Sequence, residues 1–395
     1  MGNGQTTTNT PPLNKKHPPR PRGHPQPRGP PPLPPANSIL NKKRNERKST
    51  WRNNTTTTGG GGRSSGGEIP IGYVCKLCNV PGHFFQNCPT APHPPTKQPE
   101  ACYATFDGGT VVCRSENPTH AWSILSQSSA PCLQSTPVEI SSLSSTGTTE
   151  WNPKTHVRIV CVSDTHGKHR KMTQAIPNGD VLVHAGDFTN VGHTWQVKDV
   201  CDWMSDMPHK HKIIIAGNHD VTLDAEYYDE PRHWQRFHHL KRNDDVEARA
   251  SIRTAEGVIY LEDESVVIEG YHFYGSPWQP EFCDWAFNLE RGHPCQKVWK
   301  KIPTNTDVLL THGPPVGHGD ELSSGGNVMN GQRGGCVDLL SEVTERVAPL
   351  YHIFGHIHES YGATTNGTTT FVNASTCTHS YRPDNAPVVI DLPRL

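Results

Sequence analysis

Five short polar clusters in the second half of the chain each follow a run of apolar residues. Each cluster combines aspartate, asparagine or histidine with a nearby glycine. The clusters are Asp164-Thr165-His166, Gly186-Asp187, Gly217-Asn218-His219-Asp220, Thr311-His312-Gly313 and Gly355-His356-Ile357-His358. Carboxylate, amide and imidazole groups bind borderline divalent cations such as Mn, Fe, Co and Zn, and glycine allows the backbone to turn sharply at a crowded centre.

The sequence offers seven candidate ligands, and this number limits the kind of metal site that they can form. Seven are one too few for two separate four-ligand sites, but they are enough if one carboxylate bridges two metals. Two metals about 3.5–4 Å apart can hold a phosphate and lower the pKa of a bound water, which then attacks at neutral pH. Taken singly, each cluster has an ordinary explanation as a turn or a surface residue. Together, and each after a strand, they favour one phosphoester-hydrolysing site.

Short β-branched runs separated by glycine-rich turns supply the strands that would position these clusters. The runs are Val157–Val162, Val181–His184, Ile213–Ala216, Val258–Leu261, Val266–Ile268, His272–Tyr274, Val308–Thr311, His352–Phe354, Thr369–Val372 and Val388–Ile390. Between the early runs lie helix-length stretches such as Trp195–Met207, where Trp195, Val200 and Trp203 fall on one stripe that we interpret as core packing. The pattern predicts an α/β domain with stacked sheets and outer helices.

The ordered clusters resemble the signature of the calcineurin-like metallophosphoesterases. Further strings are similar to the metallophosphoesterase-domain-containing (MPPED) branch of that superfamily. They are Ala185-Gly186-Asp187-Phe188-Thr189, Tyr274-Gly275-Ser276-Pro277-Trp278-Gln279-Pro280, Asp284-Trp285-Ala286-Phe287-Asn288-Leu289, Thr311-His312-Gly313-Pro314-Pro315 and Phe371-Val372-Asn373-Ala374-Ser375. The resemblance runs from about Val157 to Pro393 and implies a four-layer α/β/β/α sandwich.

The resemblance also implies a role for each residue of the clusters. Asp164, His166 and His358 would bind the first metal, Asn218, His312 and His356 the second, and Asp187 would bridge them. His219 would act at the scissile phosphate as general acid or electrostatic stabiliser, with its orientation supported by Asp220. The residues after Asp187 lack the Asp-Arg-Gly of Ser/Thr protein phosphatases, which disfavours that activity. The resemblance to the MPPED branch implies instead a phosphodiesterase acting on nucleotide or RNA esters. Trp278 and Trp285 are interpreted as packing residues, with base stacking as the alternative.

A second motif, Cys75-x2-Cys78-x4-His83-x4-Cys88, is similar to the retroviral CCHC zinc knuckle. Three thiolates and one imidazole predict a closed tetrahedral Zn²⁺ site, and in so short a segment the metal must supply the folding energy. Resembling modules bind single-stranded RNA or DNA. The residues predicted to contact nucleic acid are Tyr73, Phe84 and Phe85, which would stack on bases, and Lys76, which would contact phosphate. A protein-binding knuckle is the alternative.

Residues 1–70 differ from the rest of the chain in charge and composition. They contain twelve Lys and Arg against two acidic residues and carry +10, whereas the remaining residues carry −11. With eight apolar residues, this segment cannot bury enough surface to offset its ordering entropy, and we predict a disordered tail. Its Lys42–Lys48 stretch has three interpretations: a nuclear localisation signal, an RNA-phosphate contact or a solvated tail. The predicted divisions are tail 1–70, knuckle 71–90, Ser/Thr/Pro-rich linker 91–153 and phosphoesterase domain 154–395.

The composition also bears on compartment. No run approaches the roughly 18 apolar residues of a membrane span, and no signal peptide is evident. The spacing of the twelve cysteines favours metal ligation plus reduced thiols over disulfides, which predicts a cytoplasmic or nuclear protein. Residues Met1–Thr6 fit the N-myristoylation pattern at Gly2, and four basic residues nearby would add an electrostatic signal for peripheral membrane binding.

Two function hypotheses follow. The favoured one is a dinuclear metal-dependent phosphoesterase, which uses a metal-activated water and whose substrate is a phosphodiester or phosphomonoester. The alternative is an RNA-binding adaptor whose large domain binds metal but has weak or no activity, because a knuckle joined to a +10 tail is also typical of nucleic-acid binding.

Overall fold

The structure is a computed structural model that describes residues 1–2, 103–106, 109–114, 117–144, 152–324 and 327–395. The predicted zinc ligands Cys75, Cys78, His83 and Cys88 lie outside the described residues, as do the predicted nucleic-acid contacts Tyr73, Lys76, Phe84 and Phe85. Most of the predicted tail is outside them too. Gly2, the predicted acylation site, is described and exposed.

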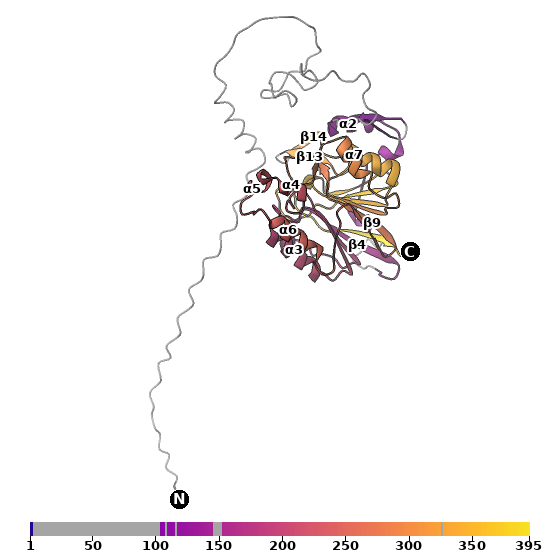
Figure 1. Ribbon diagram of the computed structural model, residues 1–395. Coiled ribbons are helices and arrows are strands. Elements are labelled where there is room, and N and C mark those ends of the chain that lie inside the picture. The colour runs from indigo at the N-terminus through magenta and orange to yellow at the C-terminus, as the bar shows by residue number, and fades with distance from the viewer. Residues whose placement is uncertain (3–102, 107–108, 115–116, 145–151, 325–326) are drawn as a thin grey trace, which may run out of the picture. The chain divides into compact units, whose positions relative to one another are not determined.

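Two mixed sheets form the centre of the fold (Figure 1). The five-stranded sheet has the order β18 (Val388–Pro393), β4 (His156–Val162), β5 (Val181–Ala185), β6 (His211–Ile215) and β7 (Val258–Tyr260). The seven-stranded sheet has the order β3 (Thr136–Val138), β16 (Gly362–Thr365), β17 (Thr370–Asn373), β15 (Tyr351–Phe354), β12 (Val308–Thr311), β9 (Tyr271–Ser276) and β8 (Glu264–Ile268). Strands β4 to β7 are parallel to one another, and so are β9, β12, β15 and β17.

Side chains alternate between the two faces of each strand, and this alternation separates the layers. In β4, Ile159 and Cys161 point into the core between the sheets, where they meet residues such as Leu310 of β12. Val160 and Val162 point to the opposite face and pack under helices. Buried β-branched side chains therefore occupy both faces of the central strands, as expected for parallel strands covered on both sides.

Helices cover the outer face of each sheet. The five-stranded sheet packs against α3 (Thr194–Asp206) and α6 (Asp244–Arg253), which lie side by side in Figure 1. The seven-stranded sheet packs against α7 (His293–Trp299) and α8 (Val337–Glu342). The predicted four-layer α/β/β/α sandwich is confirmed. One detail of the predicted helix stripe is wrong, because Trp195 is 66% exposed at the start of α3 while Val200 and Trp203 are buried.

The segment predicted as a linker, residues 91–153, contains ordered structure that belongs to the sandwich. Its elements are β1 (Tyr103–Thr105), β2 (Val111–Cys113), α2 (Pro118–Leu125), η3 (Pro131–Leu133), β3 and η4 (Ile140–Leu143). Strand β3 pairs with β16, and Ala121, Leu125 and Leu133 pack against Val337 and Leu340. The prediction failed because a few well-spaced apolar residues suffice when a neighbouring domain completes their core.

The remaining described elements are short and connect the layers. They are α4 (Ala225–Asp229), α5 (Pro231–Gln235), β10 (Gln279–Pro280), β11 (Asn288–Leu289), β13 (Glu321–Ser324), β14 (Asn327–Arg333), the 3-10 turns η5 (His169–Lys171) and η7 (His358–Ser360), and the π-helical turn η6 (Val343–Val347). Within the described ranges, no helix is both long and apolar enough to cross a membrane. Six described cysteines are free thiols: Cys161, Cys201, Cys283, Cys295, Cys336 and Cys377.

Candidate metal centre

The predicted ligands lie at the carboxyl ends of five parallel strands, where the connecting loops of a sheet converge. Asp164 and His166 follow β4, Asp187 follows β5 and Asn218 follows β6. From the other sheet, His312 follows β12, while His356 and His358 follow β15. Each sheet therefore contributes to a single cluster at one end of the sandwich, which we call the ligand cluster.

Three of these side chains form the first trio, Asp164, His166 and His358. All three are at most 8% exposed, and their donor atoms lie within 4.8 Å of one another. His358 Nε2 is 3.3 Å from Asp164 Oδ1 and 3.1 Å from His166 Nε2. Two imidazole nitrogens and a carboxylate oxygen that face one common point form a donor set suited to one borderline divalent cation.

A second trio consists of Asp187, His312 and His356, and its donor atoms also lie within 4.8 Å of one another. The Asn218 amide belongs beside it, because Asn218 Oδ1 is 3.1 Å from His312 Nε2. Asp187 Oδ2 is 3.4 Å from His312 Nε2 and 3.9 Å from His166 Nε2 in the first trio. A single carboxylate oxygen thus faces both trios.

Hydrogen bonds from outside the trios orient the ligands. The Nδ1 atoms of His312 and His358 lie 3.0 and 3.2 Å from the carbonyl oxygens of Ala185 and Thr378. An Nδ1–H donated to each carbonyl leaves Nε2 with its lone pair directed into the cluster, the arrangement that metal-binding histidines adopt. Asp164 is held by the His356 amide at 3.0 Å and by the Ser375 hydroxyl at 2.9 Å.

The backbone around the cluster adopts a conformation that L-residues rarely take. Asp164, His166, Asp187 and His356 have φ values of 52°, 44°, 53° and 68°. Such left-handed residues cost free energy and persist only where the surroundings impose them, which is typical of functional sites. A Cβ at Gly217 would overlap Asp187 Oδ1, so this glycine makes room for the Asp187 carboxylate.

Burial and the neighbouring imidazoles have opposite effects on the pKa values of the Asp164 and Asp187 carboxylates. Burial alone would raise the pKa of Asp164, but the hydrogen bond and charge of His358 outweigh it and hold the pKa well below its usual value. Asp187 shows the same balance, with His312 as the main opposing group. Burial also lowers the pKa of His312, yet the Asp187 carboxylate raises it to about 9. The carboxylates therefore stay ionised and draw positive charge into the cluster.

His219 lies beside the first trio. Its ring packs on Trp285 with centroids 4.1 Å apart and meets His166 edge-on at 4.6 Å. Its Nδ1 is 2.8 Å from the Asn190 carbonyl oxygen, so an Nδ1–H donated there leaves Nε2 on the other side of the ring. Burial lowers the pKa of His219.

Asp220, predicted to support the orientation of His219, contacts the surrounding loops. Its carboxylate accepts hydrogen bonds from the Gly217 and Thr189 amides and from the Thr189 hydroxyl at 2.8–2.9 Å. Burial, with a smaller effect of Asp187, raises the pKa of Asp220 to about 7. Asp220 therefore fixes the loops that carry Asn218 and His219 through their main chain.

Aromatic residues surround the ligand cluster, and the sequence analysis singled out two of them, Trp278 and Trp285. Trp285 supports His219, and Trp278 packs on Phe287 and donates Nε1–H to Asp263 at 3.3 Å, so packing is the better interpretation of both. Sequence reasoning missed Phe282 and Tyr381, whose rings lie beside His356 and His358. No spacing signal links these two residues to the ligands, although Phe282 falls in the loop before Asp284-Trp285.

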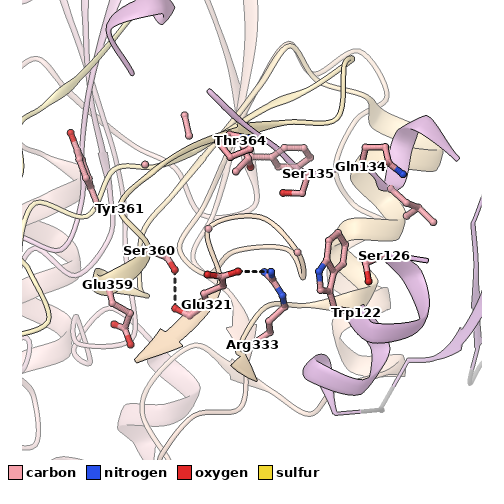
Figure 2. Close-up of a pocket in the computed structure, with 17 residues that line it drawn as sticks. Trp122, Ser126, Gln134, Ser135, Glu321, Arg333, Glu359, Ser360, Tyr361 and Thr364 are labelled. Carbon is pink, nitrogen blue, oxygen red and sulfur yellow. Dashed lines mark hydrogen bonds and ion pairs between the residues drawn. The ribbon is translucent and has the colours of Figure 1, made fainter. Parts of the chain in front are cut away.

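A cavity of about 560 Å³ lies elsewhere in the domain, and none of the seven predicted ligands lines it (Figure 2). Among the residues that line it, Arg333 lies beside Trp122 of α2, and Thr364 lies beside Ser135. Arg333 donates to Glu321 at 2.7 Å and packs on the Trp122 ring. The cavity shows that the segment before residue 154 completes the surface of the domain.

A second group of buried donors is formed by Cys295, Cys336 and Asp338, and we call it the thiol cluster. Its donor atoms also lie within 4.8 Å of one another. Trp299 Nε1–H donates to Cys336 Sγ at 3.4 Å, the Cys295 thiol donates to the Glu290 carbonyl at 3.3 Å, and Arg114 pairs with Asp338. The cluster lies among the core residues under α7 and α8.

The chain belongs to the calcineurin-like phosphoesterase family, whose model matches residues 157–360. It is therefore a metallophosphoesterase, a hydrolase of phosphoric ester bonds. It is 45% identical over 246 residues to metallophosphoesterase domain-containing protein 1 of Homo sapiens and to that of Mus musculus, which covers 61% of this chain and 72% of each relative. It is 40% identical over 237 residues, 81% of the relative, to UPF0046 protein C25E10.12 of Caenorhabditis elegans. The predicted resemblance to the MPPED branch is confirmed.

A zinc-knuckle family model matches residues 70–90, so the chain also carries a CCHC zinc knuckle. In the phosphoesterase domain, the donor chemistry fits the divalent metals that this family uses. Two ionised carboxylates, four imidazoles and one amide converge, and glycines leave room for the carboxylates. The ligand cluster is therefore a candidate dinuclear centre.

Proposed function

We propose that the chain is a dinuclear metal-dependent phosphodiesterase that acts on nucleotide or RNA phosphodiesters. The observation that supports this most directly is the position of Asp187 Oδ2, 3.9 Å from His166 Nε2 and 3.4 Å from His312 Nε2. A carboxylate oxygen that faces two ligand trios is what two cations with a shared bridge require.

In this proposal the ligands divide between two divalent cations, which can be Mn, Fe, Co or Zn. Asp164, His166 and His358 would hold one, Asn218, His312 and His356 would hold the other, and Asp187 would bridge them. The chemistry that such a pair supplies is charge neutralisation at the phosphate and a water of lowered pKa. The loops that carry these ligands, in which four ligands have a left-handed backbone conformation, keep the ligands in place before substrate binds.

His219 is the side chain that we assign to the leaving group. Its Nδ1–H is committed to the Asn190 carbonyl, so Nε2 is the ring atom that carries the second proton when the ring is protonated. The phosphate charge of the substrate favours that protonated ring, which then donates to the departing oxygen and stabilises the transition state. Trp285 holds the ring from one side, and Asp220 holds the loop that carries it.

The proposal is tested with the full-length, Mn²⁺-loaded protein and bis-(p-nitrophenyl) phosphate. We expect hydrolysis that chelation abolishes and that Asp187→Asn loses. Asp199→Asn is the matched control, because that carboxylate pairs with Arg170 on the surface and is not a ligand. Hydrolysis that survives both chelation and Asp187→Asn would contradict the proposed centre.

The zinc-knuckle match favours a second candidate, an RNA-binding adaptor with little catalytic activity. We propose that Cys75, Cys78, His83 and Cys88 bind Zn²⁺ and that the knuckle contacts single-stranded RNA or DNA. The full-length protein should then bind single-stranded RNA with an affinity that falls steeply with salt, and Cys78→Ser should weaken that binding. Cys283→Ser, a change at an exposed free thiol, is the control. If RNA binding is the same in both variants, the knuckle is not the contact.

The first residues of the chain support a proposal about location. We propose that Gly2 is N-myristoylated and that the chain acts in the cytoplasm or nucleus, with peripheral membrane contact through the acyl chain and the basic tail. Mass spectrometry of the N-terminus tests this directly. A free or acetylated N-terminus would dismiss the lipid anchor.

A further inference from the structure

Exposed aromatic side chains are concentrated beside the ligand cluster. Among the described residues, three large aromatic side chains are strongly exposed: Trp195 at 66%, Phe282 at 48% and Tyr381 at 45%. Trp195 lies on α3, on the outside of the sandwich. Phe282 and Tyr381 both lie next to predicted ligands. A single exposed apolar side chain is common, so it is the placement of two exposed rings against one cluster that points to a ligand-binding surface.

The two rings contact different members of the ligand cluster. The Phe282 ring meets His356, a member of the second trio, at a centroid distance of 5.5 Å and an angle of 90°. The Tyr381 ring meets His166 and His358, both of the first trio, at 4.9 and 5.0 Å. Each trio therefore has its own aromatic side chain at the surface.

Trp285 shows what a packing aromatic looks like at the same site. Its ring contacts His219 at 4.1 Å, Phe237 at 5.0 Å and the Arg236 guanidinium at 5.4 Å. These neighbours account for its role. Phe282 has one described ring contact, with His356, and nearly half of its surface is accessible to solvent.

The segments that carry the two rings are conformationally strained. Cys283, Asp284 and Phe287 follow Phe282 with φ values of 53° to 58°, and Tyr381 itself has φ 57°. Together with the four left-handed ligands, these make eight of the twelve left-handed non-glycine residues in the described part of the chain. Backbone strain of this kind persists where function requires a particular orientation. At Tyr381, Lys168 Nζ also lies 5.4 Å from the ring centroid and adds a positive charge.

We propose that Phe282 and Tyr381 form two stacking sites for the bases of the substrate, one for each ester arm of a phosphodiester between two nucleosides. This inference rests on the proposed phosphodiesterase function and names its substrate class. With the phosphorus at the ligand cluster, the two ester arms extend toward opposite trios. A flat base on each arm then covers the ring beside it. Stacking is tolerant of base identity because every base has a π-face.

The test compares a dinucleoside monophosphate with the matching phosphodiester that lacks both bases. The leaving group is a sugar hydroxyl in each, so the two substrates differ in stacking. The variants are Phe282→Leu and Tyr381→Leu, which keep apolar bulk and remove the ring, with Trp195→Leu as the matched control. Each is measured as the metal-loaded, full-length protein.

We expect each ring variant to lose about tenfold in kcat/KM on the base-bearing substrate, within the roughly 5- to 150-fold that stacking of one base contributes. The loss on the abasic substrate should be smaller than the loss on the base-bearing one, and Trp195→Leu should match wild type on both. An equal loss on the two substrates would assign the rings to packing and overturn the inference. An unchanged kcat/KM on the base-bearing substrate in both ring variants would also overturn it.

A binding measurement separates this inference from the proposed function. Calorimetric titration with a nucleoside 5′-phosphate and with ribose 5-phosphate reports stacking without turnover. If the wild type hydrolyses neither phosphodiester, the proposed function fails. The stacking sites would still be supported if Phe282→Leu or Tyr381→Leu weakened binding of the nucleoside 5′-phosphate but not of ribose 5-phosphate. If hydrolysis proceeds and the two ligands bind all variants alike, the stacking sites are wrong and the phosphodiesterase stands.

Discussion

The ligand cluster and the thiol cluster each bring buried metal-binding side chains within 4.8 Å of one another, yet their surroundings differ. In the ligand cluster, imidazoles keep Asp164 and Asp187 ionised, and four ligands have left-handed backbone. In the thiol cluster, a hydrogen bond with Cys336 and, to a smaller extent, burial raise the pKa of the Cys295 thiol, and none of the three members has positive φ.

The partners of the two clusters explain the difference. Trp299, Glu290 and Arg114 each contact one member of the thiol cluster, at Cys336 Sγ, Cys295 Sγ and Asp338 Oδ1, and the cluster lies in the core under α7 and α8. At the ligand cluster, His312 and His358 use Nδ1 for hydrogen bonds to backbone carbonyls outside the cluster. Their Nε2 atoms therefore remain directed at the other ligands. Proximity of donors is thus a weak criterion for a metal site. Ionisation, backbone strain and free inward atoms discriminate better.

The largest effect is expected at the bridging carboxylate. Asp187→Ala should lose bound metal from both trios and lower kcat/KM by far more than a hundredfold, since the loss of an outer-shell partner alone costs about 10–100-fold. Metal content by atomic spectroscopy and activity at saturating Mn²⁺ measure the two effects. If both metals stay bound in Asp187→Ala, the bridge is wrong.

A loss of turnover without loss of metal is expected at His219. His219→Ala should lower kcat by about 10²–10⁴-fold, the usual contribution of a general acid, while both metals stay bound. His193→Ala is the control, because that ring packs on Trp195 away from the cluster. Wild-type turnover in His219→Ala at saturating Mn²⁺ would remove the proposed role.

Two glycines allow a matched comparison between the clusters. A Cβ at Gly217 would overlap Asp187 Oδ1, whereas one at Gly335, beside the thiol cluster, would overlap the Pro315 carbonyl. Gly217→Ala should weaken metal binding by about 10–100-fold, and Gly335→Ala should lower the melting temperature without changing metal affinity. Equal metal affinity in the two variants would mean that room for the bridging carboxylate is unimportant.

The smallest effect is expected in the thiol cluster. Cys336→Ala removes the acceptor of the Trp299 indole N–H and leaves a small cavity, so it should cost about 1–3 kcal/mol of unfolding free energy. The number of metal ions bound per chain should not change. One fewer bound ion in this variant would mean that the thiol cluster is itself a metal site.

The sequence was sufficient for the ligand order because each ligand follows a recognisable strand, and strand ends in parallel sheets converge. It was insufficient wherever the outcome depends on long-range packing. The Asp220 carboxylate turned toward backbone amides because those amides are buried and need acceptors. Trp195 fitted the apolar stripe of α3 but lies at its first turn, beyond the sheet. Phe282 and Tyr381 are 99 residues apart, and only the fold brings them to one cluster.

Strand β3 determines how the phosphoesterase domain can be isolated. It pairs with β16, which otherwise has one neighbour, β17. A chain shortened to begin at residue 154 loses β3 and leaves the amides and carbonyls of β16 available to another molecule, the usual route to edge-to-edge aggregation. It also uncovers Val337 and Leu340, which α2 and η3 shield. The segment that covers the β16 edge and the side chains of Val337 and Leu340 therefore precedes β4, the first strand that is followed by predicted metal ligands.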